Sequence, residues 1–301
     1  MRDTLKVASA QYPIDAPETL LDWRDKIVRW VENGAATGAE LLVFPEYAAI
    51  EQAHALGREV FSDLGETLRQ TAALAGERVA LHAELAREHG VHILVGSGPL
   101  EIAEGQFVNA AQLVTPTGAV GEQHKLILTP FEHDWGMVAG EEVRVFDTDI
   151  GRIAITICYD SEFPLLARAM ADAGAELLLV PQCTERISGH HRVRAGAMAR
   201  ALENQMCAVT SPTIGDALWS PAVDRNAGSA GLYVPAEHGV SDTGVLAEGA
   251  LNVPGWITGT IDFTGLRRLR SSGEMRNFAD WLHQPGASAA QANARTKVVT
   301  L

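Results

Sequence analysis

The stretch ITICYDSEFP places Cys158 where a β-branched run ends and a helix is expected to begin. At such an elbow, the backbone N–H groups and the dipole of the following helix favour a thiolate. The N–H of Tyr159 is then placed to face an oxyanion that forms beside the sulfur. The alternative is that Cys158 is a small buried apolar residue, as many free cysteines are. Cys158 is therefore a candidate nucleophile, with Tyr159 as a candidate substrate-binding residue.

Two further strand-like runs carry a charged residue. Glu46 follows a proline at the end of ELLVFPE, and Lys125 interrupts the apolar part of GEQHKLILTP. A glutamate in such a place is ordinarily a solvated rim residue, whereas a lysine within a strand must be exposed or paired. The structural alternative for Lys125 is an edge-strand charge that prevents aggregation. Taken singly, neither residue indicates a function.

The elements that must position these residues alternate between strand-like and helix-like patterns over the first two thirds of the chain. Helices are predicted over 16–34, 65–90, 161–174 and 190–205, and strands over 5–13, 40–46, 91–102, 107–118, 119–128, 175–182, 207–212 and 230–236, with a hairpin over 142–158. Asp15 and Glu18 are expected to form a capping box, and Gly90 is expected to end the second helix. Hairpins mixed with helical connections indicate an α/β fold that is not purely parallel. The strands lack the glycine-rich phosphate loop of a dinucleotide site.

No linker, repeat or low-complexity segment divides residues 1–262, so one domain is expected there. Residues 263–301 are rich in Ala and Arg and are expected to form a C-terminal arm that packs on a partner subunit. Trp281, Leu282 and the closing residues 298–301 are largely apolar. Burying a large apolar side chain contributes about 1.5–3 kcal/mol, and a two-fold subunit contact would bury both arms reciprocally. A homodimer or a larger even-numbered homo-oligomer is therefore expected.

The composition indicates which partners and which cellular compartment to expect. It has 301 residues, of which 47% are hydrophobic, a formal net charge of −14, and three cysteines without metal-type spacing. Nucleic acids and anionic membranes need a basic footprint, so neither is expected as a partner. Reduced thiols, together with the lack of a signal-peptide core or of a bilayer-length apolar run, predict a cytoplasmic protein.

The order FPE, then HK followed by an apolar stretch, then CYD resembles the nitrilase, or carbon–nitrogen hydrolase, superfamily over residues 4–262. This resemblance implies an α/β fold in the form of an αββα sandwich, with two mixed sheets and outer helix layers. It also implies that Glu46 is a general base, Lys125 a stabilising cation and Cys158 the nucleophile. Glu132 in TPFEHDWG matches a second glutamate that many members carry, whose role is to align Lys125 or to hold the substrate's nitrogen.

The chemistry is consistent with the implied roles. A thiol is a poor nucleophile at neutral pH unless a base takes its proton or a cation stabilises the thiolate. Glu46 would do the first and Lys125 the second, so that the sulfur attacks an amide and forms a thioester. A water activated by Glu46 would then release the acid. The expected function is a thiol amidohydrolase that acts on a small linear amide and requires no metal or organic cofactor.

Four more residues are candidates for the substrate pocket. Trp135 either walls the pocket or is a core tryptophan, and Tyr47 follows Glu46 directly. Cys183 and Thr184 follow the strand over 175–182, whose end is expected beside that of the Cys158 strand, although Cys183 is equally a buried spectator.

Several alternatives remain open. His124 stands where the family often has arginine, and Cys158-Tyr159-Asp160 replaces the Cys-Trp-Glu of many nitrile-cleaving members, which favours amides. The alternatives are a nitrilase, an N-carbamoyl hydrolase, an acyl transferase that shares the thioester, and a catalytically silent binding subunit. His190 and His191 diverge by about 100° on a helix, so a shared metal ion is not expected and their role stays open.

Overall fold

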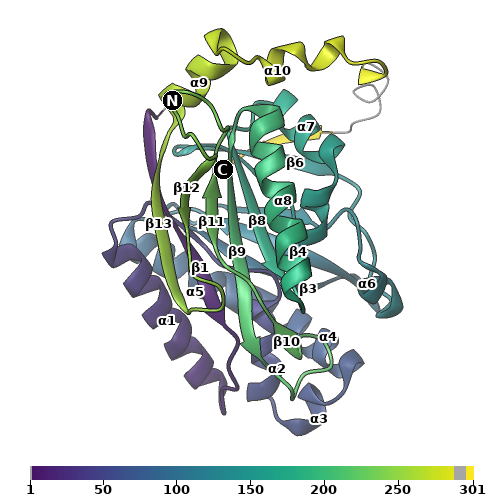
Figure 1. Cartoon of the computed structure of the whole chain (residues 1–301). Coiled ribbons are helices and arrows are strands. Elements are labelled where there is room, and N and C mark those ends of the chain that lie inside the picture. Colours follow the sequence, from purple (N-terminus) through teal and green to yellow (C-terminus); the bar gives the residue numbers. More distant parts are fainter. Residues whose placement is uncertain (1, 288–295) are drawn as a thin grey trace.

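The computed structural model describes residues 2–287 and 296–301. Two mixed β-sheets pack face to face, and helices cover the outer face of each (Figure 1). Across the first sheet the strands follow the order β13 (Gly255–Asp262), β1 (Thr4–Pro13), β2 (Leu41–Val43), β3 (His92–Ala103), β4 (Gln106–Val114) and β5 (Val120–His124). The β1–β2–β3 pairs are parallel and the others are antiparallel.

The second sheet is also mixed. Its order is β14 (Thr296–Thr300), β6 (Val143–Thr148), β7 (Gly151–Ile155), β8 (Leu177–Cys183), β9 (Cys207–Asp216), β11 (Gly231–Tyr233) and β12 (Val245–Glu248), and β10 (Arg225–Asn226) also pairs with β9. The two sheets join where Tyr12 and Pro13 of β1 pair with Thr213 and Ile214 of β9. This corner brings the ends of several strands from both sheets to one place.

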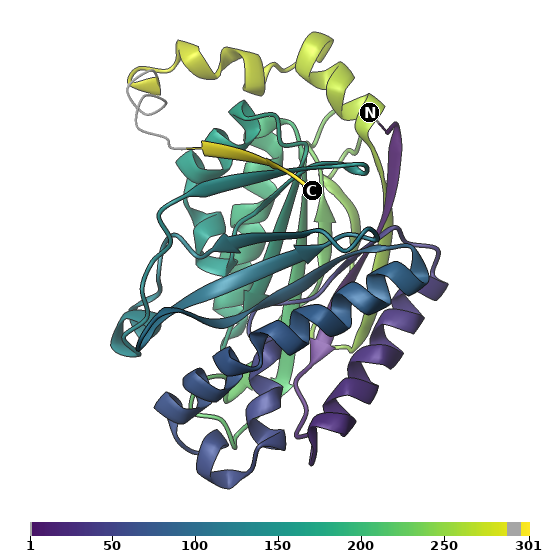
Figure 2. The same ribbon diagram turned by 180° about the vertical axis from the view of Figure 1, so that it is seen from behind.

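Two helices cover the outer face of each sheet. On the first sheet lie α1 (Leu20–Ala36) and α5 (Ala75–His89), which run beside each other in Figure 2, and on the second lie α7 (Pro164–Asp172) and α8 (Ile187–Asn204). The remaining helices of the described residues are η1 (Ala48–Ile50), α2 (Glu51–Ala55), α3 (Arg58–Phe61), α4 (Leu64–Ala73), α6 (Pro130–Asp134), η2 (Cys158–Glu162), α9 (Phe263–Ser272), α10 (Asn277–Asp280) and η3 (Trp281–His283). The expected αββα sandwich is confirmed. Within the described residues, no helix has both the length and the apolar character needed to cross a membrane.

The side chains of β1 show why the layers form. Successive side chains of a strand point to opposite faces of its sheet. Leu5 and Val7 belong to the core between the sheets, whereas Ala8 and Ala10 belong to the cluster that packs against α1 and α5. Both faces of this strand are therefore buried, which requires a layer on either side of it.

Several local predictions hold, and others are corrected. Gly90 ends α5 in the left-handed region, with φ = 65°. The capping box of α1 is formed by Thr19 and Asp22, not by Asp15 and Glu18, because the helix begins only at Leu20. Asp15 instead forms an ion pair with Lys26 at 2.8 Å.

The strand expected over 119–128 ends at His124, one residue before Lys125 and four residues earlier than predicted. The backbone N–H of Lys125 donates to the carbonyl of Asn109 at 2.8 Å, and the carbonyl of Lys125 accepts from Gly140 at 2.7 Å. The chain thereby leaves the sheet at the lysine. Lys125 is thus not an edge-strand charge but the buried first residue of a partly buried connection.

The C-terminal segment packs in part on its own chain. β14 pairs in parallel with β6, with Val298 opposite Val145, and it is the yellow strand beside the second sheet in Figure 2. The guanidinium carbon of Arg168 lies 4.8 Å from the ring centre of Trp281, whereas Leu282 is 52% exposed. The closing strand therefore has a partner without a second subunit. Residues 288–295 of the expected arm lie outside the described residues, and the arm's contact with a partner stays a prediction.

Candidate active site

One buried ammonium group lies between two buried carboxylates. The Nζ of Lys125 lies 2.8 Å from Oε1 of Glu46 and 2.8 Å from Oε2 of Glu132. Each of the three residues is only 1% exposed. Buried charges of this kind are stable only when they are paired and hydrogen-bonded. The predicted base, the cation and the second glutamate are thus one charged cluster.

Glu46 reaches this cluster because the chain after β2 stays against the neighbouring strand. Glu46 forms an isolated parallel bridge with Ser97, and the N–H of Ser97 donates to the carbonyl of Pro45 at 3.1 Å. Gly96 has φ = 86°, and a Cβ added there would lie 2.1 Å from the carbonyl oxygen of Pro45. Only glycine allows this close approach, which turns the carboxylate of Glu46 into the cluster.

Glu132 is held by the start of a short helix. Thr129 is the N-cap of α6, and the backbone N–H of Thr129 donates to Oε2 of Glu132 at 2.8 Å. The hydroxyl of Thr129 in turn accepts from the N–H of Glu132 at 3.3 Å. This capping box fixes the rotamer of a glutamate whose carboxylate also contacts Lys125. The phenol of Tyr47 donates to Oε1 of Glu132 at 2.7 Å.

Cys158 occupies a strained turn at the end of the second sheet's β7. Its φ is 49°, in the left-handed region that non-glycine residues rarely adopt. Strain of this kind is found at functional sites, where the surrounding structure enforces it. The turn is η2, whereas the α-helix that follows begins only at Pro164. The helix expected over 161–174 therefore begins three residues later than predicted, and a 3₁₀ turn, not an α-helix, contains the cysteine.

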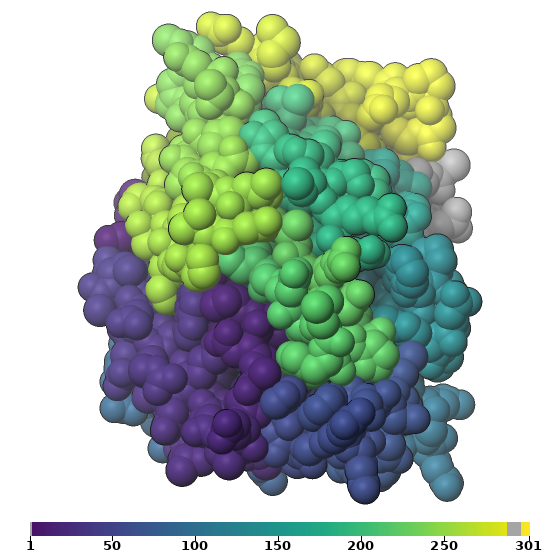
Figure 3. All heavy atoms as spheres, turned by 60° about the horizontal axis from the view of Figure 1, so that its bottom comes forward, coloured from purple at the N-terminus to yellow at the C-terminus, as the bar shows by residue number. Residues whose placement is uncertain are grey.

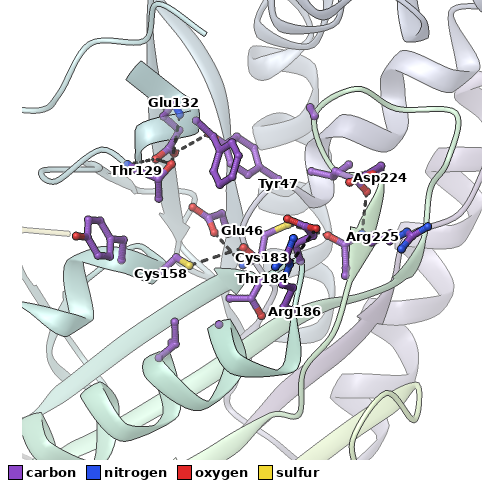
Figure 4. A pocket seen from close by; sticks show the side chains of 18 of the residues that line it. Glu46, Tyr47, Thr129, Glu132, Cys158, Cys183, Thr184, Arg186, Asp224 and Arg225 are labelled. Carbon is purple, nitrogen blue, oxygen red and sulfur yellow. Dashed lines mark hydrogen bonds and ion pairs between the residues drawn. The ribbon is translucent and has the colours of Figure 1, made fainter. Parts of the chain in front are cut away.

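The peptide of Cys183 lies between the nucleophile and the base. Its N–H donates to Oε2 of Glu46 at 2.8 Å, and its carbonyl accepts from the sulfur of Cys158 at 3.8 Å. Figure 4 shows Glu46 and Cys158 beside Cys183 in the same space. The Cys183 side chain donates to Oδ1 of Asn226 at 2.9 Å. Cys183 is consequently a positioned part of the pocket and not a buried spectator.

Burial and the neighbouring charges shift the pKa values of Glu46 and Glu132 in opposite directions. Burial raises the pKa of Glu46 above its ordinary value, and Lys125 opposes this only in part. Burial also acts to raise the pKa of Glu132, but Lys125 and the hydrogen bonds from Thr129 and Asn109 hold that pKa below the ordinary value. Two carboxylates with pKa values shifted in opposite directions can take different roles, one in proton transfer and one as a fixed charge.

The thiol and the ammonium group are also shifted. Burial, followed by the charge of Glu46, raises the pKa of Cys158 well above its ordinary value. Burial acts to lower the pKa of Lys125, but Glu46 and Glu132 raise it well above the ordinary value. The sulfur is therefore a thiol at neutral pH and needs a base before it can attack, which corrects the expectation of a thiolate favoured by the elbow.

All nine predicted site residues line a single cavity of about 500 Å³. They are Glu46, Tyr47, Lys125, Glu132, Trp135, Cys158, Tyr159, Cys183 and Thr184. Tyr47 and Trp135 form one wall, with their ring centres 5.9 Å apart. In Figure 3 the green segment around residues 216–226, of which residues 221–226 line the cavity, lies beside the blue residues of α2–α4 and the teal residues that precede 150.

Asn109 and Asp160 are among the residues of this region that were not predicted as part of the site. The Nδ2 of Asn109 lies 3.0 Å from Oε1 of both Glu46 and Glu132, so one amide bridges the two carboxylates. Asp160 is fully buried and accepts backbone N–H groups from both sides of the site. Asn109 lies in the middle of the expected strand over 107–118 without a distinguishing local pattern. Asp160 had a local signal, its position two residues after the cysteine.

His190 and His191, whose role the sequence left open, do not line this cavity. His190 is buried, and its Nε2 lies 3.3 Å from the hydroxyl of Ser229. The His190 and His191 rings lie 5.1 Å apart. Over residues 2–287 and 296–301, the structure contains no cluster of three His, Cys, Asp or Glu side chains placed to hold a metal ion.

The two-sheet sandwich brings a buried cysteine, lysine and glutamate into one cavity. Residues 6–234 match the family described as carbon-nitrogen hydrolase, so this chain belongs to the carbon–nitrogen hydrolase family.

Three proteins illustrate the similarity. The chain is 33% identical over 277 residues to the probable hydrolase YhcX of Bacillus subtilis, which covers 92% of this chain and 53% of that protein. It therefore spans about half the length of that relative. It is 27% identical over 212 residues to omega-amidase NIT2-B of Xenopus laevis, covering 67% and 70% of the two chains. The structure of Saccharomyces cerevisiae Nit3, a member of branch 10 of the nitrilase superfamily, has a TM-score of 0.72 at 19% identity and covers 91% and 96%, which shows the shared fold.

Proposed function

We propose that this chain is a thiol amidohydrolase that cleaves a small linear amide to a carboxylic acid and ammonia or an amine. The observation that carries the proposal is the cluster in which Lys125 lies 2.8 Å from Glu46 in the cavity that Cys158 also lines. The omega-amidase among the chain's relatives supports an amide as the substrate class. Glu46, Lys125 and Cys158 are the proposed catalytic residues, and Glu132 is the proposed residue that positions Lys125.

The first half of the proposed reaction forms a thioester. Glu46 takes the proton of Cys158 as the sulfur attacks the amide carbon, because the thiol's pKa is too high for spontaneous ionisation. The electron pair of the carbonyl moves to its oxygen, where the Lys125 ammonium and the Tyr159 N–H stabilise the negative charge. Glu46 then gives the proton to the nitrogen, the carbon–nitrogen bond breaks, and ammonia or an amine leaves.

The second half hydrolyses the thioester. Glu46, again a carboxylate, takes a proton from water as that water attacks the thioester carbon. The carbon–sulfur bond breaks, the carboxylic acid leaves, and the proton on Glu46 returns to the sulfur. Every proton is accounted for by Glu46, so the cycle needs no further co-reactant than water.

Glu132 has a positioning role in this proposal. Its lowered pKa keeps it negatively charged beside Lys125 throughout the cycle. With one carboxylate always ionised, Lys125 stays protonated even while Glu46 carries a proton. The pocket face formed by Tyr47 and Trp135 would hold the substrate's acyl chain, and Thr184 lines the cavity near Cys183.

The test is an activity panel of linear primary amides, N-carbamoyl compounds and nitriles, with Cys158→Ala as the negative control. We expect ammonia release from at least one amide, no release from the matching nitrile, and no activity of Cys158→Ala. Ammonia released directly from the nitrile would identify a nitrilase, and release only from carbamoyl compounds would identify an N-carbamoyl hydrolase. Failure with all three classes would favour a binding subunit.

Hydroxylamine added to a turning-over reaction tests the thioester. It competes with water for the thioester carbon, so a hydroxamate is expected to form in place of part of the acid. A hydroxamate yield that exceeds hydrolysis would indicate that acyl transfer is the main reaction.

The three cysteines are free thiols in the structure, which suits a reducing compartment. We propose a cytoplasmic enzyme on this basis, and cell fractionation with an antibody against the chain would test it.

A further inference from the structure

Asp160 joins two segments that carry different parts of the proposed machinery. Its Oδ1 accepts the backbone N–H of Ile127 at 2.7 Å, and its Oδ2 accepts the N–H of Ile157 at 3.1 Å. The N–H of Leu126 lies 3.2 Å from Oδ1 and 3.3 Å from Oδ2. Leu126 and Ile127 directly follow Lys125 in the chain, and Ile157 directly precedes Cys158.

The backbone on both sides needs such an acceptor. β5 ends at His124, so the N–H groups of Leu126 and Ile127 are not part of a strand ladder. A buried N–H group without a partner costs about 1–3 kcal/mol. Asp160 is 0% exposed, and its carboxylate oxygens accept the N–H groups of both residues in place of a neighbouring strand. Its carboxylate is therefore a crosslink between the lysine connection and the cysteine turn.

The cysteine turn is also held from its other side. The hydroxyl of Ser161 donates to the carbonyl of Cys158 at 2.7 Å, and Arg200 donates to the carbonyl of Ser161 at 3.1 Å. These bonds fix the strained turn to α8 but do not reach the lysine. Among the hydrogen bonds of the described residues, those of Asp160 connect the turn to the Lys125 connection directly.

We propose that Asp160 is a positioning residue that sets the separation between the Lys125 ammonium and the Cys158 sulfur. The proposal rests on the proposed function, because it assigns Asp160 to the same nucleophile and cation. Loss of the carboxylate frees the connection and the turn to move independently. A misplacement of about 1 Å between catalytic groups can cost about 10²-fold in rate.

The test compares Asp160→Ala and Asp160→Asn with wild type in kcat, KM and melting temperature. For Asp160→Ala we expect a fall of about 10- to 100-fold in kcat with KM within about 3-fold of wild type. Asp160→Asn keeps one carbonyl oxygen that can accept an N–H, so it should recover part of kcat. If Asp160→Ala does not fold, Asp160→Asn carries the comparison.

Glu51→Gln is the matched control. Glu51 is also a fully buried carboxylate that accepts a backbone N–H, from Asp15, but it does not line the cavity. We expect Glu51→Gln to lose stability while keeping kcat within about 2-fold, because it touches neither Lys125 nor Cys158. A fall in kcat of Glu51→Gln that matches that of Asp160→Asn at equal melting temperature would show a general stability effect and overturn the proposal.

The rate of Cys158 alkylation by iodoacetamide provides a readout that is independent of the substrate. If Asp160 holds Lys125 close to the sulfur, folded Asp160→Ala and Asp160→Asn should be alkylated at least several-fold more slowly than wild type at the same pH. An unchanged alkylation rate in the folded variants overturns the positioning role, whatever the substrate is. Slower alkylation in a protein that hydrolyses no amide would retain the role of Asp160 and reject the amidase proposal instead.

Discussion

The Nζ of Lys125 lies 2.8 Å from Oε1 of Glu46, although 79 positions separate the two residues in the chain. Glu132 contacts the same ammonium from a different element, at 2.8 Å. One cation is therefore shared by two carboxylates in a buried site. This sharing is what allows one carboxylate to exchange a proton while the other keeps its charge.

Cys158 is expected to be the most alkylation-sensitive of the three thiols. It lies beside a base and a cation, whereas the thiol of Cys183 donates to Asn226 and Cys207 is fully buried. Limiting iodoacetamide followed by mass mapping should find the label on Cys158 first, with loss of turnover. Labelling of Cys183 first, with activity preserved, would contradict the assignment.

Glu46→Gln and Lys125→Ala should each fold and lose at least about 10²-fold in kcat/KM, the range for removing a base or an oxyanion donor. Lys125→Ala should also lower the melting temperature, because two buried carboxylates are left without their cation. Lys26→Ala is a matched control, because Lys26 also pairs with a buried glutamate, Glu51, outside the cavity. A near-wild-type rate in either folded site variant would reject the proposed role of that residue.

Glu132→Gln should shift the pH dependence of kcat/KM as well as lower its maximum. In wild type, the acidic limb should lie above pH 4.5, because the pKa of Glu46 is raised above that ordinary value and Glu46 must be ionised to act as a base. The negative charge of Glu132 contributes to that rise. Its removal should lower the pKa of Glu46 and move the acidic limb to lower pH. A limb that stays in place, or moves to higher pH, would show that another group controls it.

Deletion of residues 275–301 should destabilise the chain and weaken its assembly. The truncation removes β14 from the edge of β6 and removes Phe278, whose ring centre lies 4.5 Å from the guanidinium carbons of both Arg168 and Arg270. We expect a lower melting temperature and a smaller mass by light scattering at micromolar concentration. A full-length protein that is monomeric would reject the predicted homodimer or larger even-numbered homo-oligomer. An unchanged mass after truncation would show that the arm does not hold the subunits together.

The sequence by itself determined which residue types stand at the strand ends and which faces the strands bury. Glu46, Cys158 and Gly90 each lie next to a change from one local pattern to another, so their neighbours reveal their places. The alternation in β1 likewise follows from the period of a strand, which is local. These features were predictable because they depend on a few adjacent residues.

The tertiary structure decided how these residues act on one another. Asn109 bridges two carboxylates from the middle of a strand, and Asp160 accepts the N–H of Ile127, which lies 33 positions away in the chain. The raised pKa of Cys158 results from burial and from the charge of Glu46, neither of which a local window contains. The pairing of β14 with β6 depended on the same long-range packing. Electrostatic interactions and desolvation depend on distance in space, and only the folded chain sets those distances.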